Sequence, residues 1–250
     1  MTDASGDREG MLVPSLKDML SVDMRKARWI LVIEKEATFR SIAASGFWTT
    51  IASNGIIVTG KGYPDIATRA LLRFLSTASP QNDFCSPPVY GLMDFDPDGM
   101  AMLSVYKHGS AALAHENAEL RVPKLKWLGM QSRHIILATG SDDHASQGLL
   151  TLTTRDRQKA KRMLERSFAR QSQSGEHKDN GDRDHVGFSP SHVPSALNGL
   201  NDEDQQAAED TEWCRELQVM MMLNMKAELQ LLDGVQDGMK SLLTGELNAF

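Results

Sequence analysis

One stretch, residues 89–99, constrains this chain more than any other. It reads V-Y-G-L-M-D-F-D-P-D-G, a short apolar run that ends in acids at alternate positions and then a glycine. An apolar run closed by a turn signal predicts a buried strand. Side chains two positions apart on extended backbone point the same way, so we expect Asp94 and Asp96 to lie together where the strand ends. In open α/β sheets that edge binds ligands, and paired carboxylates supply half of a Mg²⁺ site.

Two further apolar runs indicate the sheet to which this strand belongs. Residues 29–33 (W-I-L-V-I) are followed directly by Glu34, and residues 55–59 (G-I-I-V-T) lead into a Gly-Lys-Gly turn. Helical spacing follows each run, and residues 125–130 are a further strand candidate. Strands that alternate with helices predict an α/β fold with a mainly parallel sheet.

Composition divides the chain into four parts. Residues 1–27 are predicted to be a linker and residues 28–170 the α/β domain. Residues 171–211 are rich in Ser, Asn, Asp and Gly, which predicts a disordered insertion because such a segment buries too little apolar surface. Residues 212–250 are predicted to be a helical segment that packs back on the same domain, with a Leu- and Met-rich helix over 212–232. The net charge of −6 comes from the acidic residues after position 170.

The bulk composition excludes several classes of protein. Cys85 and Cys214 are the only cysteines, which argues against a disulfide framework or a zinc site. No apolar run approaches the roughly 20 residues of a membrane helix, and the first ten residues are polar and acidic rather than signal-like. We therefore expect a soluble protein of a reducing, intracellular compartment.

The acids at positions 94–98 can be interpreted as three different kinds of site. A calcium-binding loop needs a glutamate at its twelfth position, where this chain has Val105, and a preceding helix. An aspartyl-nucleophile phosphatase suits a strand that ends in D-x-D, but Asp98 stands where that class is expected to have a small hydroxyl residue. A Mg²⁺ site shared by two strands explains more, because Glu34 follows one buried strand and the Asp94–Asp96 pair another. A lone glutamate in a loop is more often simply solvated, so the argument depends on the repeated pattern.

Four blocks of sequence resemble one family in the same order. They are W-I-L-V-I-E-K-E-A-T-F at 29–39, G-K-G-Y-P-D-I-A-T-R at 60–69, the run at 89–110 and L-K-W-L-G-M-Q at 125–131. Together they resemble the A subunit of DNA topoisomerase VI and, more closely, its eukaryotic relative, the meiotic double-strand-break protein. The resemblance covers roughly residues 29–168 and has a weaker continuation at 213–232.

The resemblance implies a Toprim domain, a parallel α/β fold with flanking helices, in which Glu34, Asp94 and Asp96 hold Mg²⁺ beside the scissile phosphate. It also implies double-stranded DNA as the partner, with Lys61, Lys107 and Arg155 as candidate phosphate contacts. A homodimer, a topoisomerase VI B-like subunit, other meiotic recombination proteins and a nuclear, chromosome-associated location follow from the same resemblance.

One departure limits this expectation. In this family a tyrosine in an upstream winged-helix domain attacks the phosphodiester, whereas the tyrosines here are Tyr63, Tyr90 and Tyr106, all inside the Toprim-like blocks. We therefore expect no catalytic nucleophile in this chain and no DNA cleavage by the chain alone. Two alternatives stay open: a non-catalytic DNA-binding or dimerisation module, and a metal-dependent phosphatase or nuclease.

Overall fold

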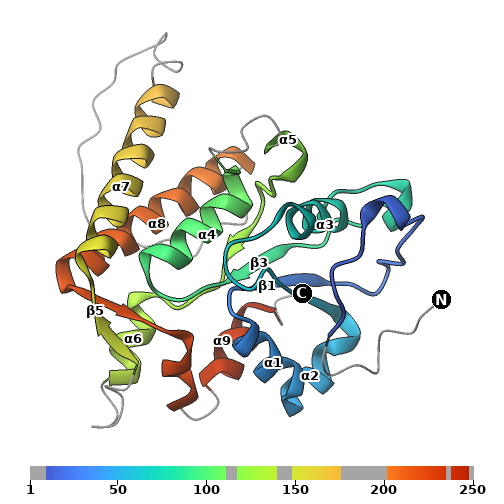
Figure 1. Cartoon of the computed structure of the whole chain (residues 1–250), viewed down its shortest axis with the longest axis horizontal. Helices are drawn as coiled ribbons and strands as arrows, with labels where there is room; N and C mark the ends of the chain where they lie inside the picture. The colour runs from blue at the N-terminus through green and yellow to red at the C-terminus, as the bar shows by residue number, and fades with distance from the viewer. Residues whose placement is uncertain (1–9, 111–116, 140–147, 176–201, 235–237, 248–250) are drawn as a thin grey trace.

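A four-stranded parallel sheet forms the centre of the molecule, in the strand order β2-β1-β3-β4 (Figure 1). The computed structural model describes residues 10–110, 117–139, 148–175, 202–234 and 238–247. The strands are β1 (Trp29–Ile33), β2 (Gly55–Thr59), β3 (Val89–Leu92) and β4 (Lys126–Trp127). The predicted α/β fold with a parallel sheet is confirmed.

The two faces of this sheet are covered by different helices (Figure 1). In β1, Leu31 and Ile33 belong to the buried cluster on one face, and Ile30 and Val32 to the cluster on the other. Alternate side chains of a strand point to opposite faces, so a run that is apolar throughout requires cover on both. The first face is covered by α1 (Glu36–Ala44), α2 (Gly46–Ile51) and α9 (Gly238–Leu247), and the second by α3 (Ile66–Ser76) and α4 (Pro97–His108).

The remaining elements connect or flank these layers. The short helices are α5 (Asn117–Leu120) and α6 (Ser132–Thr139), and the two long ones are α7 (Thr154–Gly175) and α8 (Asp202–Leu223). The 3-10 turns are η1 (Leu16–Asp18), η2 (Ala52–Asn54), η3 (Pro80–Asn82) and η6 (Leu229–Gly234). No helix within the described ranges is both long enough and apolar enough to span a membrane.

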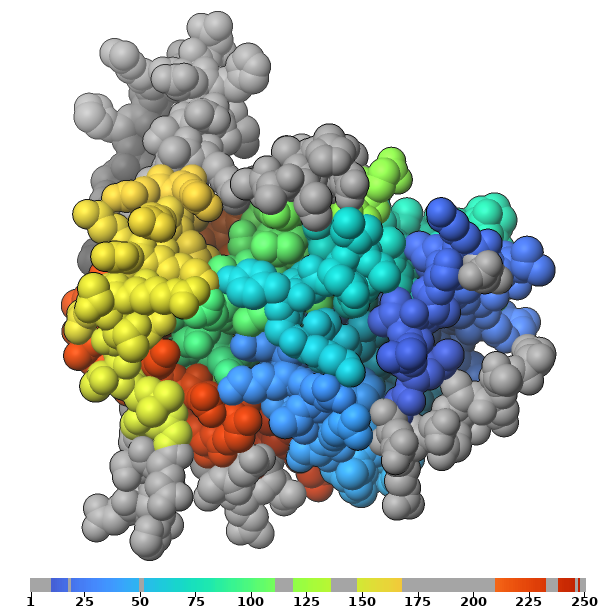
Figure 2. Space-filling model, in the orientation of Figure 1, coloured from blue at the N-terminus to red at the C-terminus, as the bar shows by residue number. Residues whose placement is uncertain are grey.

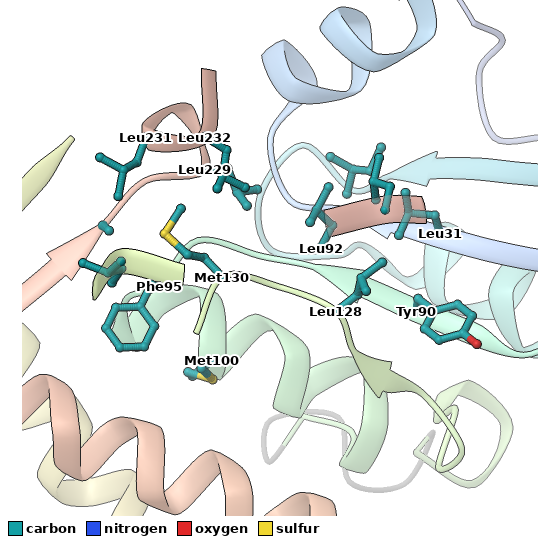
Figure 3. Packing of buried hydrophobic residues seen from close by; sticks show 14 of the residues in the cluster. Leu31, Tyr90, Leu92, Phe95, Met100, Leu128, Met130, Leu229, Leu231 and Leu232 are labelled. Carbon is teal, nitrogen blue, oxygen red and sulfur yellow. The ribbon is translucent and has the colours of Figure 1, made fainter. Parts of the chain in front are cut away.

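A second, two-stranded sheet joins the C-terminal part of the chain to the acidic loop. Strand β5 (Leu149–Thr151) pairs antiparallel with β6 (Met225–Ala227), and Ala227 also pairs with Phe95 in the loop after β3. The space-filling view shows the red C-terminal segment between the yellow β5–α7 region and the blue α1 region (Figure 2). Leu229, Leu231 and Leu232 of this segment belong to the same buried cluster as the end of β3 (Figure 3).

The boundaries expected for the insertion and the C-terminal helix need correction. Residues 171–175 and 202–211, expected to be disordered, belong to α7 and α8, while residues 176–201 lie outside the described part of the chain. The helix expected over 212–232 ends at Leu223, because Asn224 adopts a left-handed conformation with φ 53°. The residues after it pair with β5 instead, so an apolar pattern typical of a helix is divided between a helix and a strand.

Two smaller expectations also change. The expected linker over 1–27 is not free where the structure describes it, because Met24 is buried and Leu16 and Val22 pack against the cluster under α3. The strand expected at 125–130 is reduced to β4, because Leu125 donates its amide to Val122 in a turn rather than to β3.

Candidate metal centre at the carboxyl edge of the sheet

The carboxyl ends of β1 and β3 lie level with one another. Ile33 is paired with Leu92 in the parallel register, and the amide of Glu34 continues the ladder by donating to the Leu92 carbonyl at 3.1 Å. The first acid after each strand therefore meets the other: the Asp94 amide donates to Glu34 Oε2 at 2.9 Å. The carboxylate of Glu34 thus contacts the backbone of Asp94, and only 7% and 3% of these residues are exposed.

Both carboxylate oxygens of Asp94 have partners. The amide of Leu229 donates to Oδ1 at 2.9 Å, from a segment 135 residues further along the chain. The ammonium of Lys35 lies 2.8 Å from Oδ2 and also 3.4 Å from the carboxylate of Glu228. Asp94, which follows β3, is therefore held by Lys35 at the start of α1 and by Leu229 of the C-terminal segment.

Asp96 is placed by the start of α4. It is the N-cap residue of that helix, with extended backbone, and its Oδ1 accepts the amide of Gly99 at 2.6 Å. Asp is favoured at this position because its side chain satisfies an amide that has no partner within the helix. Pro97 occupies the first helical turn, where a missing amide hydrogen costs nothing. The D-x-D-P sequence thus ends a strand, caps a helix and presents a carboxylate.

Burial and the neighbouring negative charges make it harder for these acids to ionise. Burial first, and then the negative charge of Asp94, raises the pKa of Glu34 to about 8. Burial also raises the pKa of Asp96, with the charges of Asp94 and Asp98 adding to the shift. Lys35 has a raised pKa although burial opposes it, because Asp94 and Glu228 stabilise its charged form. A cluster in which desolvation and like charge disfavour the carboxylates is one that an added cation would stabilise.

Gly99 allows α4 to approach these acids closely. A Cβ at this position would lie 2.6 Å from the Asp94 carbonyl oxygen and 3.1 Å from Glu34 Oε2. The close packing of α4 against the acidic loop therefore requires a residue without a side chain at this position.

The donor set fits Mg²⁺ in its chemistry, because Glu34, Asp94 and Asp96 offer hard carboxylate oxygens at the ligand-binding edge of a parallel sheet. Within the described ranges, however, no three His, Cys, Asp or Glu side chains are already arranged to hold a metal ion. The Oδ2 of Asp94 is paired instead with the ammonium of Lys35.

The three candidate phosphate contacts lie in different surroundings. Lys61 is exposed on the loop after β2, with its ammonium 3.3 Å from Glu36, and Gly62 ties this loop to Glu34 through a 2.9 Å backbone hydrogen bond. Arg155 is exposed in the first turn of α7.

Lys107 does not suit a phosphate contact. Its side chain is 0% exposed, lies 3.6 Å from Asp210 and stands over the ring of Trp213. It forms part of the α4–α8 contact, and we correct the expectation that it is available to DNA. The position of a lysine near a helix end gave no sign that another helix would cover it.

Several residues of the site were not singled out from the sequence. Lys35 stands in the visible E-K-E motif, and its position between two acids was a usable signal. Glu228 and Leu229 carry no such signal, because only the antiparallel pairing of β6 brings them to the site. A further polar group connects the loops around it: Lys159 of α7 pairs with Asp98 and donates to the Tyr63 hydroxyl at 3.0 Å.

A parallel α/β domain with two acid-ended central strands and a D-x-D loop defines the class of Toprim domains. The sequence model of the Toprim domain that Spo11 shares with the A subunit of topoisomerase 6 matches residues 29–179. The chain therefore belongs to the topoisomerase VI A/Spo11 Toprim family, as the sequence blocks predicted.

Known relatives agree with this assignment. The chain is 37% identical over 158 residues to the meiotic recombination protein SPO11-1 of Oryza sativa subsp. indica, covering 62% of this chain and 37% of that protein. It is 36% identical over 160 residues to the A subunit of the type 2 DNA topoisomerase 6 of Aeropyrum pernix, and 34% identical over 142 residues to the human meiotic recombination protein SPO11. The alignments cover 62% and 57% of this chain and 38% and 33% of those proteins, so the chain spans about a third of the length of the relatives it matches.

Proposed function

We propose that this chain is the metal-holding part of a topoisomerase VI A-like protein that breaks both strands of DNA during meiosis. Glu34, Asp94 and Asp96 would hold Mg²⁺ next to the scissile phosphate. The observation that supports this most is the meeting of Glu34 and Asp94 across the level ends of β1 and β3, in a domain that belongs to this family.

The bound ion would supply positive charge beside a phosphodiester whose own charge increases in the transition state. The residues of this chain would orient it. Asp94 is held by Leu229, Asp96 is fixed by its helix cap, and Gly99 lets α4 pack closely against both Asp94 and Glu34. Lys61 and Arg155 are the exposed cations that we propose as phosphate contacts, whose binding should weaken steeply with salt.

The nucleophile would come from outside this stretch of sequence. Tyr90 and Tyr106 are buried, and the exposed Tyr63 is bonded to Lys159. We propose that a tyrosine of a winged-helix domain attacks the phosphate, and that the chain described here does not cleave DNA alone. Cutting two strands needs two such sites, so the proposal includes a homodimer, whose nuclear partners would be other meiotic recombination proteins and a topoisomerase VI B-like subunit.

The proposal is tested by incubating the purified chain with duplex DNA and Mg²⁺, with and without a family winged-helix fragment that carries the tyrosine. We expect protein covalently attached to DNA only in the mixture, and loss of this product in the Asp94→Asn variant. A covalent product with the chain alone would contradict the missing nucleophile. DNA binding without any product in the mixture would favour the non-catalytic module, and turnover of a simple phosphate ester that Asp94→Asn abolishes would favour the phosphatase or nuclease.

A further inference from the structure

The ammonium of Lys35 lies beside Asp94, where the proposed metal ion would have to bind. It lies 2.8 Å from Oδ2 of a carboxylate that is almost fully buried, and the Lys35 side chain is 32% exposed. A divalent cation at the same oxygen would stand within a few ångströms of this ammonium. Like charges so close repel strongly at the dielectric of a partly buried site, so the two cannot share Asp94 without a rearrangement.

Glu228 offers Lys35 a second partner within reach. Its carboxylate is already 3.4 Å from the ammonium, and its side chain is 46% exposed, so it can keep part of its hydration while it accepts a cation. A shift of the ammonium toward Glu228 would free Asp94 without leaving Lys35 unpaired.

The backbone on either side of Glu228 is fixed to the site itself. Ala227 exchanges two hydrogen bonds with Phe95, at 2.8 and 3.0 Å, and Leu229 donates to Asp94. The backbone of Glu228 is therefore held beside Asp94, although it comes from the other end of the chain. An acid on a free surface loop would have no such defined position relative to Asp94.

We propose that Glu228 is a positioning residue of the metal site, which takes the ammonium of Lys35 from Asp94 when a divalent cation binds. The inference rests on the proposed Mg²⁺ site and extends it, because it assigns a role to a residue outside the D-x-D loop and the β1 glutamate. Glu228 acts through Lys35, so its effect on metal affinity should depend on Lys35 being present.

The test measures binding of Mn²⁺ to the full 250-residue chain from the electron paramagnetic resonance signal of the free ion. Glu228→Gln should weaken binding about fivefold, because Lys35 then stays on Asp94. Lys35→Met should tighten binding, because the competing charge is gone. Adding Glu228→Gln to Lys35→Met should change affinity less than about twofold, and Glu119→Gln, which removes an acid from the surface of α5, should leave it unchanged.

A second readout follows the ammonium itself. In nitrogen-15 spectra of lysine side chains, the signal that Lys35→Met removes should shift when Mg²⁺ saturates the wild-type chain and should reach a different end position in Glu228→Gln, where no carboxylate accepts the displaced ammonium. A merely structural role for Glu228 would not produce this difference.

The outcomes separate the two proposals. If wild-type Mn²⁺ binding is absent, or survives Asp94→Asn, the metal site and this inference both fail. If Asp94→Asn abolishes binding while Glu228→Gln weakens it equally with and without Lys35, or has no effect, the metal site stands and the role of Glu228 is overturned.

Discussion

At the scale of single residues, the site depends on a small number of close approaches. Glu34 and Asp94 are in direct hydrogen-bond contact, and Gly99 brings the first turn of α4 against both. Asp96 serves the helix as a cap and offers a carboxylate at the same edge. One short segment of sequence therefore carries both a structural and a proposed chemical role, and substitutions should affect the two differently.

Gly99→Ala should destabilise the protein although alanine normally favours a helix. The new Cβ would meet the Asp94 carbonyl oxygen at 2.6 Å, and overpacking of this kind costs about 1–3 kcal/mol in the free energy of unfolding. Urea denaturation measures the change. The matched control is Gly245→Ala in α9, where a Cβ meets nothing within 4 Å and a gain of about 0.5–1 kcal/mol is expected. Equal effects at the two glycines would contradict the close approach.

At the scale of secondary-structure elements, the start of α7 is fixed to strand β6. Asp156 accepts the amide of Thr153 at 2.9 Å, its own amide donates to the Thr153 hydroxyl, and Lys226 of β6 lies 2.9 Å from the same carboxylate. This capping box joins the two-stranded sheet to the long helix, and β6 in turn positions Glu228 and Leu229 at the acids.

The pH dependence of stability should report this contact. Burial alone would raise the pKa of Asp156, but the hydrogen bonds from Lys226 and Thr153 outweigh it and lower the pKa below its ordinary value of 3.8. A lowered native pKa means that the stabilisation is present above the unfolded value, at neutral pH, and is lost as pH falls through the native pKa.

Asp156→Asn should therefore cost about 1 kcal/mol at pH 7 and progressively less below about pH 4, as urea denaturation would show. The exposed Glu165→Gln, whose acid is 4.0 Å from Lys161, should change the free energy of unfolding by less than about 0.5 kcal/mol. A cost for Asp156→Asn that stays constant down to about pH 3 would show that the carboxylate charge is not what Lys226 recognises.

The sequence predicted the central part of this arrangement because the governing interactions are local. Buried strands are continuous apolar runs, and the acids follow them directly, so the sheet, Glu34 and Asp94 could be found without a structure. That β1 and β3 end at the same edge of the sheet could be inferred only once the sheet was predicted to be parallel.

The contribution of Glu228 and Leu229 could not be predicted, because it depends on a pairing between segments that lie far apart in the sequence. Lys107 shows the opposite error: its charge indicated a surface, but Trp213 and Asp210 of a distant helix cover it.

At the scale of the whole molecule, the C-terminal segment completes a domain whose acidic edge is formed near the start of the chain. The leucines of η6 enter the cluster under β1 and β3 (Figure 3), and the segment lies between α1 and the β5–α7 region (Figure 2). We propose that a divalent cation binds at this assembled edge. That claim concerns binding and can be tested without any cleavage reaction.

The most direct measurement is the calorimetric titration of Mg²⁺ into the full chain and into Glu34→Gln. The glutamine keeps an acceptor for the Asp94 amide but cannot ionise to a carboxylate ligand, so we predict binding to the wild-type chain and none to the variant. Glu36→Gln, which removes an acid two residues further along, should bind Mg²⁺ as the wild-type chain does. Undiminished Mg²⁺ binding by Glu34→Gln, or no binding by the wild-type chain, would contradict the proposed metal site.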